Sequence, residues 1–232
     1  MSRRILRSFI LRPFASRRFA LGTLGAVLAI GAWLGLSWHS GNAFFPPLHR
    51  MLLDAASYWF TAAGLADIAS TLTNMGLGLV LGIALGAAGG LLIGQVRVLD
   101  LALSPLIEFV RAIPSVALLP AAIGILGIGS AMKVASIALS VMWPVLLSTI
   151  DGMRHLPAQW LDTARVFHFS AWRRQLLVVV PALVPRILAG VNVAVPLSLV
   201  VAVTSEMIGT TAGIGSVVLN AQYTFDVERM WS

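Results

Sequence analysis

Five long apolar runs, separated by short polar segments, are the feature that most constrains this chain. Each is close to the roughly 20 residues that a helix needs to cross the hydrocarbon layer of a bilayer. The runs cover about 20–38, 68–93, 101–128, 133–150 and 176–204. With 58% hydrophobic and only 11% charged residues, a soluble fold would have to expose more apolar surface than water tolerates. The sequence therefore predicts an all-α membrane protein, a polytopic helical bundle with about five spans.

Basic residues are distributed unequally between the segments that separate these runs. About eleven of them fall in the N-terminal tail, at Arg97 and in the polar segment 151–175, against about three in the segments assigned to the other side. Because cytoplasmic loops carry an excess of Lys and Arg, we expect the N-terminus and segment 151–175 to lie in the cytoplasm. The expected parts are a basic cytoplasmic tail (1–19), a first transmembrane helix (20–38), a periplasmic loop with a surface helix (39–67) and a membrane core (68–232).

The N-terminal residues Ser2-Arg3-Arg4 loosely resemble a twin-arginine export signal, so the first run has a second interpretation as a cleaved signal peptide. Several further spans follow it, and no convincing small-residue cleavage site is present. We therefore favour an uncleaved first span.

The polar segment 151–175 lies between the fourth and fifth apolar runs and must form a loop outside the membrane. Pro157 is suited to the first position of a helix, where its missing N–H removes no hydrogen bond. Trp160, Ala164 and Phe167 then recur at a spacing of three to four residues, which places them near one helical face. The pattern predicts a short amphipathic helix at about 158–169.

The second run contains a glycine at every fourth position. These glycines lie along one stripe of a helix and allow a neighbouring backbone to approach closely. They are Gly78, Gly82, Gly86, Gly90 and Gly94. The stripe predicts close helix packing, either within the chain, which we favour, or at a subunit interface.

The third run carries charges and prolines at membrane depth. Glu108 and Arg111 are three residues apart, so they are neighbours on a helix, and we expect an internal ion pair because unpaired charges in a membrane are costly. Pro114, together with the prolines at 105 and 120, predicts a kinked or partly broken helix. Such a helix is tolerated only against protein or a water-filled cavity, so we expect it inside the bundle.

The fifth run contains three prolines, at 181, 185 and 196, and is also expected to be bent. Asn192 is a candidate for a hydrogen bond to a neighbouring helix or for the lining of a pathway. The residues 205–232 are interpreted as an external loop.

Catalytic chemistry is difficult to place on this sequence. Cysteine is absent, and the four histidines are scattered over different loops, so no metal site is predicted. Neither a phosphate-binding loop nor a nucleophile elbow is present. A membrane enzyme would need a polar cluster near one membrane face, and none is visible. The basic residues flank apolar runs, which argues against nucleic acid as a partner.

Several segments resemble the permease subunits of binding-protein-dependent ABC transporters. In that family the cytoplasmic loop reads Glu-Ala-Ala, three residues, Gly, and later Leu-Pro. The corresponding residues here are Asp162-Thr163-Ala164, His168 and Val180-Pro181. The flanking segments, over roughly 65–232, are similar to the branch that imports nitrate, sulfonates, taurine or bicarbonate. They are LSPLIEFVRAIPSVALLP, WPVLLSTIDGMRHLP, VPRILAGVNVAVPLSLVVAVTSEMIG and GIGSVV.

The resemblance implies that residues 68–232 are a permease core and that 151–175 is a coupling loop. Its helix would dock on a cytoplasmic ATP-binding subunit, which would bind ATP and magnesium, since this chain is expected to bind no cofactor. The ATPase-coupling residues would be Trp160, Asp162, Thr163, Ala164, Arg165 and His168. Further implied partners are a periplasmic solute-binding protein and a second permease subunit, expected as a homodimer in the bacterial inner membrane. The solute would be small and anionic, moved by alternating access.

The resemblance also gives Glu206 a role, as part of an external gate or as a contact for the binding protein. A solvated charge just outside the membrane is the alternative interpretation.

Three residues and the length depart from the family pattern. Asp162 replaces Glu, Thr163 replaces the first Ala, and His168 replaces a glycine that permits a sharp turn. His168 is the most serious departure, because histidine adopts the left-handed conformation less readily than glycine. The family also has a sixth helix after 205–232, so we expect the chain to be truncated. An inactive permease remnant without transport activity is therefore the alternative function.

Overall fold

The computed structural model describes residues 13–39, 44, 46–208 and 210–232. Residues 1–12 of the predicted basic tail lie outside this part. Helix α2 begins at Pro13, so the end of the tail continues directly into the first span. The chain divides into two compact units, residues 1–58 with 221–232 and residues 59–220. The first of these combines segments that the sequence analysis had placed in separate parts.

The first unit is built from the N-terminal helices and the C-terminal one. Its helices are α2 (Pro13–His39), α3 (Leu48–Trp59) and α12 (Val227–Trp231). Arg229 donates from Nη2 and Nε to the Asp54 carboxylate at 2.8 and 3.1 Å. These hydrogen bonds hold the pKa of Asp54 below its ordinary value. Arg229 also lies 4.6 Å from the centre of the Tyr58 ring, so a single arginine joins α12 to α3 through charge and an aromatic face.

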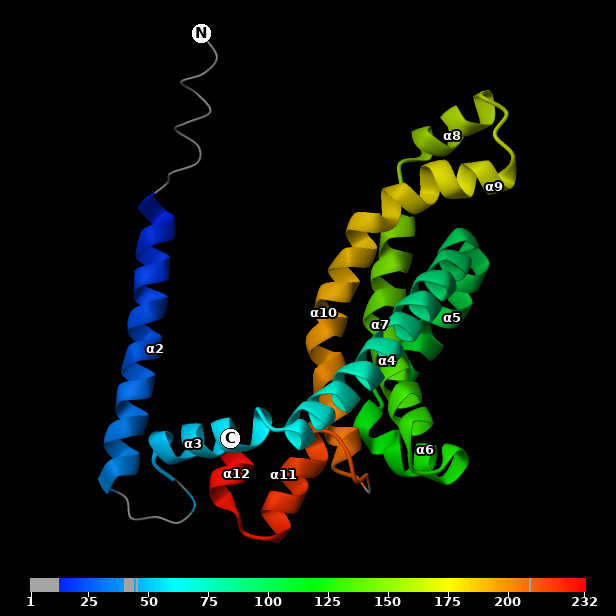
Figure 1. Ribbon diagram of the computed structural model, residues 1–232. Coiled ribbons are helices and arrows are strands. Elements are labelled where there is room, and N and C mark those ends of the chain that lie inside the picture. Colours follow the sequence, from blue (N-terminus) through cyan, green and yellow to red (C-terminus); the bar gives the residue numbers. More distant parts are fainter. Residues whose placement is uncertain (1–12, 40–43, 45, 209) are drawn as a thin grey trace. The chain divides into compact units, whose positions relative to one another are not determined.

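The second unit is helical throughout the part that the structure describes (Figure 1). Its elements are α4 (Ala62–Gln95), α5 (Arg97–Arg111), η1 (Ser115–Leu118), α6 (Leu119–Leu126), α7 (Ser130–Arg154), α8 (Ala158–Val166), α9 (Ala171–Arg174), η2 (Gln175–Val179), α10 (Val180–Glu206) and most of α11 (Ile214–Tyr223). Helix α7 packs against both α4 and α10. The core between these helices contains Ile137, Val141, Val145, Ala194 and Val201.

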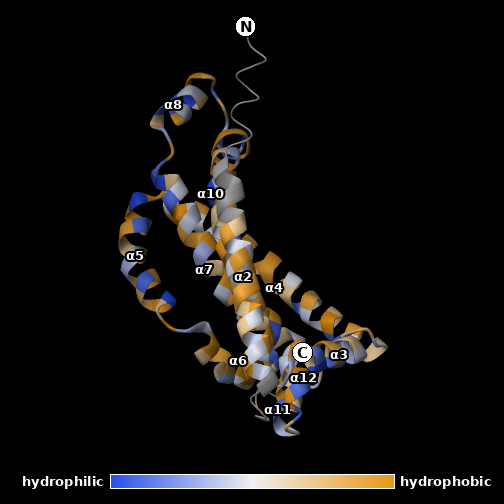
Figure 2. Cartoon of the chain, turned by 90° about the vertical axis from the view of Figure 1, so that its left-hand side faces the viewer, coloured by the Kyte–Doolittle hydropathy of each residue, from blue (hydrophilic) through white to orange (hydrophobic). Residues whose placement is uncertain are grey.

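Among the residues that the structure describes, four helices are long and apolar enough to cross a membrane. They cover 20–37, 62–95, 130–154 and 171–206, and a bent pair formed by 97–111 and 115–126 gives a fifth candidate. The predicted all-α bundle of about five spans is therefore confirmed. Figure 2 shows hydrophobic residues along α4 and hydrophilic residues on α8, as expected for a span and a loop helix.

The third span is broken where its prolines predicted a break. The two halves meet at an angle of 79°, and Pro114 stands between them as the N-cap of η1. The expectation that this span lies inside the bundle is wrong for the chain by itself. Only Asp100 and Ile107 of α5 are buried, because one narrow stripe of this amphipathic helix contacts the rest of the unit.

Two predicted boundaries also need correction. Helix α4 begins at Ala62, six residues before the expected start, because the Thr61 side chain accepts a hydrogen bond from the Gly64 N–H and caps the helix. Residues 205–232, interpreted as a loop, contain α11 and α12. The glycines at the start of this segment obscured the helical pattern that follows them.

The glycine stripe of α4 faces α7. Gly78, Gly82, Gly86 and Gly90 are all buried, and a Cβ at any of them would meet α7. At Gly86 the added atom would lie 2.6 Å from the Met142 carbonyl oxygen and 2.9 Å from the Val145 Cβ. The stripe therefore lets two helix backbones approach closely within one chain.

We predict that Gly86→Ala destabilises the second unit by about 1–3 kcal/mol, the usual cost of overpacking a core. Gly76→Ala is the matched control, because nothing lies within 4 Å of a Cβ at that position of the same helix. Unfolding of the purified protein in detergent measures the difference. Equal stabilities of the two variants would contradict the packing described here.

Candidate functional site

The loop between α7 and α10 carries a short helix of its own. Helix α8 begins after Pro157, which is its N-cap, and ends at Val166, three residues before the predicted end. Figure 1 shows α8 and α9 beyond the same ends of α7 and α10. The loop helix is therefore carried by two membrane spans.

The end of α8 is closed by a turn that depends on His168. This residue has a φ of 51°, in the left-handed region that favours glycine. The His168 N–H donates to the Arg165 carbonyl at 2.9 Å, and the Phe169 N–H donates to the Ala164 carbonyl at 3.0 Å. Together these two bonds form a Schellman motif. Histidine thus makes the kind of sharp turn that the family's glycine permits.

Three large apolar side chains on α8 and at its C-terminal end are uncovered. Trp160, Val166 and Phe167 are 50%, 74% and 67% exposed. Ala164, on the same helix, is only 3% exposed. Val166 and Phe167 were not singled out as site residues, although their spacing from Trp160 was the available signal.

The polar side chains of α8 are mostly engaged with the helix itself. Arg165 donates to the Asp162 carboxylate at 2.8 Å, and both side chains are more than half exposed. Such a pair stabilises little by itself, so either charge remains available to a partner. The Thr163 hydroxyl donates to the Gln159 carbonyl at 2.8 Å.

Two ion pairs fix the base of this loop. Arg154, the last residue of α7, donates to both carboxylate oxygens of Asp100 on α5, at 2.6 and 2.8 Å. Arg186 of α10 donates to Asp151 of α7 at 3.1 Å. The loop that bears α8 is thereby tied to α5, α7 and α10. Neither pair was predicted from the sequence, since the partners are 54 and 35 residues apart.

The predicted pathway residues do not converge on one place. Arg111 and Glu108 form the expected pair at 3.4 Å, but both side chains are about half exposed or more, so the pair is not internal. Both lie near the C-terminal end of α5, beside Ile107, which is buried against Leu146 and Ile150 of α7. Asn192 is exposed on α10, and Pro114 marks the break of the third span.

A buried polar cluster lies where α4, α7 and α10 come together. Glu206 is fully buried, and its Oε1 lies 3.6 Å from the Lys133 ammonium. Its Oε2 accepts hydrogen bonds from the Thr71 hydroxyl at 2.9 Å and from the Gly215 N–H at 3.1 Å. In this conformation Glu206 presents no surface to a binding protein, and it is not the solvated charge of the alternative interpretation.

The same cluster holds the segment that leads into α11. Lys133 donates to the Ala212 carbonyl at 2.9 Å, and Thr71 accepts from the Ile214 N–H at 2.9 Å. A Cβ at Gly213, which has a φ of 114°, would collide with the Glu206 carboxylate. The segment before α11 therefore packs directly against the Lys133–Glu206 pair.

Metal-ligating side chains are not grouped within the described residues, since no three of them stand close enough to hold an ion.

The family model for the inner-membrane component of binding-protein-dependent transport systems matches residues 78–231. The chain belongs to this family. The matched range runs from within α4 to the end of α12, and it includes the α8 loop together with Lys133 and Glu206 of the buried cluster. The resemblance inferred from the loop motif is confirmed.

Several curated permeases are similar to this family member. A probable ABC transporter permease of Haemophilus influenzae is 33% identical over 162 residues, which is 70% of this chain and 66% of the relative. A putative aliphatic sulfonates transport permease of Bacillus subtilis is 32% identical, with 67% and 56% covered. A bicarbonate transport system permease of Synechococcus elongatus is 30% identical, with 76% and 62% covered. The match thus spans less than two thirds of the length of each of these relatives.

We predict that His168→Val opens the end of α8, whereas His168→Gly preserves it. A β-branched residue is a genuine outlier at positive φ, and the left-handed conformation costs an L-residue about 1–2 kcal/mol. Phe167→Val is the control, because Phe167 has a φ of −79° and is exposed. Amide hydrogen exchange over 158–169 measures the opening. Equal protection in the valine and glycine variants would disprove the turn.

We predict that Glu206→Gln destabilises the protein by about 3–5 kcal/mol, because it leaves the buried Lys133 without its counter-charge. Adding Lys133→Met to Glu206→Gln is expected to restore part of this loss, because it removes the unpaired charge while the introduced glutamine can still accept from the Gly215 N–H. Glu228→Gln is the control, since its pair with Arg50 is largely exposed and should contribute about 0–1 kcal/mol. Chemical unfolding in detergent compares the variants. A glutamine variant as stable as this control would show that the charge pair is unimportant.

Proposed function

We propose that this chain is the permease subunit of an ATP-driven importer, and that α8 docks on a separate ATP-binding subunit. The observation that carries the proposal is the exposed apolar surface of Trp160, Val166 and Phe167 on a loop helix. A helix outside the membrane that exposes several large apolar side chains to water is typical of a protein interaction site. Asp162 and Arg165 beside them offer charge recognition at the edge.

The anchoring of the loop supports a coupling role. A helix on a free loop would absorb any displacement of its partner, whereas this loop is joined to three spans. The bidentate Arg154–Asp100 pair reaches α5, and the Arg186–Asp151 pair reaches α10. Closure of an ATP-binding subunit on α8 would therefore move these helices together. Alternating access requires this kind of rigid connection.

The excess of basic residues in and beside the α8 loop supports a cytoplasmic loop and a cytoplasmic N-terminus, in the inner membrane of a bacterium. The buried Lys133–Glu206 cluster then lies toward the periplasmic side, as part of the external gate proposed for Glu206. Trp160, Asp162, Thr163, Arg165 and His168 remain the proposed coupling residues. Ala164, which is 3% exposed, belongs to the same proposed set as a small residue of α8.

The proposed solute is a small anion. Support comes from the relatives, two of which are named for aliphatic sulfonates and for bicarbonate. The proposed partners are a periplasmic solute-binding protein and a second permease subunit, as a homodimer. ATP and magnesium would be bound by the ATP-binding subunit.

The test is co-purification of this chain with its cognate ATP-binding subunit in detergent. We predict that Asp162→Lys and the double variant Trp160→Ala with Phe167→Ala each lower the retained ATPase at least about tenfold, since central apolar contacts dominate interfaces. Phe60→Ala is the matched control, because Phe60 is an exposed aromatic residue outside the loop. Hydrogen exchange over 158–169 verifies that α8 stays folded in each variant.

Two outcomes would count against the proposal. Loss of the ATPase in the Phe60 variant as well would mean that the loop is not the docking site. A folded wild-type chain that retains no ATPase would favour the alternative of an inactive permease remnant. Uptake of labelled bicarbonate or a sulfonate by the reconstituted complex then distinguishes a working importer from an assembly without transport.

A further inference from the structure

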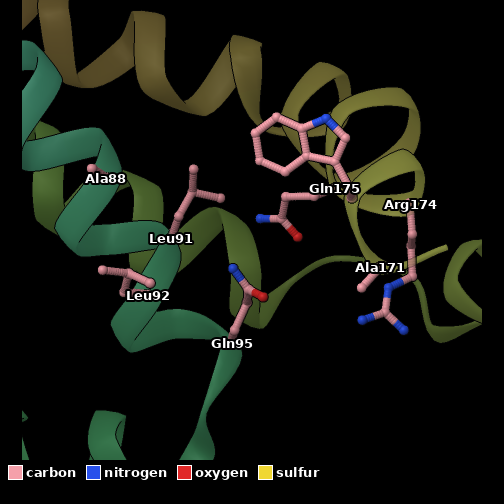
Figure 3. A pocket seen from close by; sticks show the side chains of 8 residues that line it. Ala88, Leu91, Leu92, Gln95, Ala171, Arg174 and Gln175 are labelled. Carbon is pink, nitrogen blue, oxygen red and sulfur yellow. The ribbon is translucent and has the colours of Figure 1, made fainter.

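A groove of about 450 Å³ lies between α4 and the start of the last span (Figure 3). One wall is formed by α4, near the point where this span ends at Gln95. The other wall is formed by α9 and the first residue of η2, where the last span begins. The groove is therefore placed at the level where the hydrocarbon of a membrane meets its headgroups.

The two ends of the groove differ in chemistry. Ala88, Leu91 and Leu92 line it toward the middle of α4 and give it an apolar floor. Gln95 and Arg174, which Figure 3 shows projecting from the opposing walls, make its outer end polar. An amphipathic ligand with an acyl chain and a polar head matches this gradient.

The charge at the outer end is positive and uncompensated. Within the part of the chain that the structure describes, neither Arg174 nor its neighbour Arg173 forms an ion pair with a carboxylate. Other arginines of this region do, as Arg154 and Arg165 illustrate. Trp172, which is 71% exposed and also lines the groove, is a residue type enriched at membrane interfaces. The Arg174 guanidinium is therefore available to bind an anion.

The local backbone also departs from regular helix at the groove. Gln175, which lines it, is the first residue of the π-helical segment η2. Single π-helical turns inside longer helices are frequent at functional sites. Here the wider turn follows directly after Arg174.

We propose that this groove binds an anionic phospholipid, with the phosphate on Arg174 and one acyl chain along Ala88, Leu91 and Leu92. Basic pockets between spans on the cytoplasmic side select anionic headgroups in this way. Trp172, Gln95 and Gln175 supply further donors to the headgroup. The bound lipid would fix the start of the last span to the end of α4, directly below the loop that carries α8.

The test uses the full chain in nanodiscs with equal amounts of phosphatidylglycerol and phosphatidylcholine, followed by native mass spectrometry of retained lipid. Wild type should retain phosphatidylglycerol in preference to phosphatidylcholine. Arg174→Gln should lower that retention about fivefold, the effect of removing one basic residue near an anionic surface. Arg173→Gln, one position away and outside the groove, should not change it, and Arg174→Lys should largely preserve it.

A second variant tests the apolar part without altering charge. Ala88→Trp fills the groove and should also lower retention of phosphatidylglycerol, while its unfolding temperature and that of Arg174→Gln should stay close to wild type. Equal effects of the two glutamine variants would overturn the proposal, because they indicate diffuse attraction. So would displacement of the lipid by inorganic phosphate, or a change from dimer to monomer mass in the Ala88 variant, which would identify a subunit interface. The lipid readout needs no ATP-binding subunit, so it stands or fails separately from the proposed transport function.

Discussion

The close approach of α4 to α7 is the packing contact on which the second unit depends. Four buried glycines leave α4 without a side chain at four positions that face α7, so Ile137, Val141 and Val145 approach the α4 backbone there. Helix α7 also packs against α10, where a Cβ at Gly190 would meet Pro144 and Val145 of α7. Without a hydrophobic driving force between helices in lipid, such shape complementarity carries much of the association. Helix α7 thus becomes the central element, with the α8 loop at one end and Lys133 at the other.

The sequence alone was sufficient for features that depend on local pattern. Run length predicted the spans, proline content predicted the break at Pro114, and three-to-four spacing predicted a helix at α8. The loop motif predicted the family, which the family model confirmed. These features depend on residues within a few turns of one another, where periodicity and backbone chemistry determine the outcome.

Features that depend on long-range contacts were missed or misjudged. Glu206 looked like an exposed charge because nothing near it in the sequence neutralises it, and its partners Lys133 and Thr71 are 73 and 135 residues away. The anchors of the loop, Arg154 with Asp100 and Arg186 with Asp151, were hidden for the same reason. The left-handed His168 was recognised as a departure, but its turn was fixed by hydrogen bonds that only the folded loop reveals. Ala164 fitted the apolar stripe, but the spacing alone did not indicate which residues of the stripe would be buried in the folded chain.

The two ends of α7 are held by ion pairs of unequal character. The Lys133–Glu206 pair is buried, with side chains 5% and 0% exposed, whereas the pair at the other end joins Arg154, which is 51% exposed, to Asp100, which is 12% exposed. Dissolved salt screens exposed charges much more strongly than buried ones. Rising ionic strength would therefore loosen the Arg154 end of the helix and leave the Lys133 end in place. The ionic strength of the surrounding solution would thus affect how firmly α7 is held at its Arg154 end, and much less how it is held at its Lys133 end.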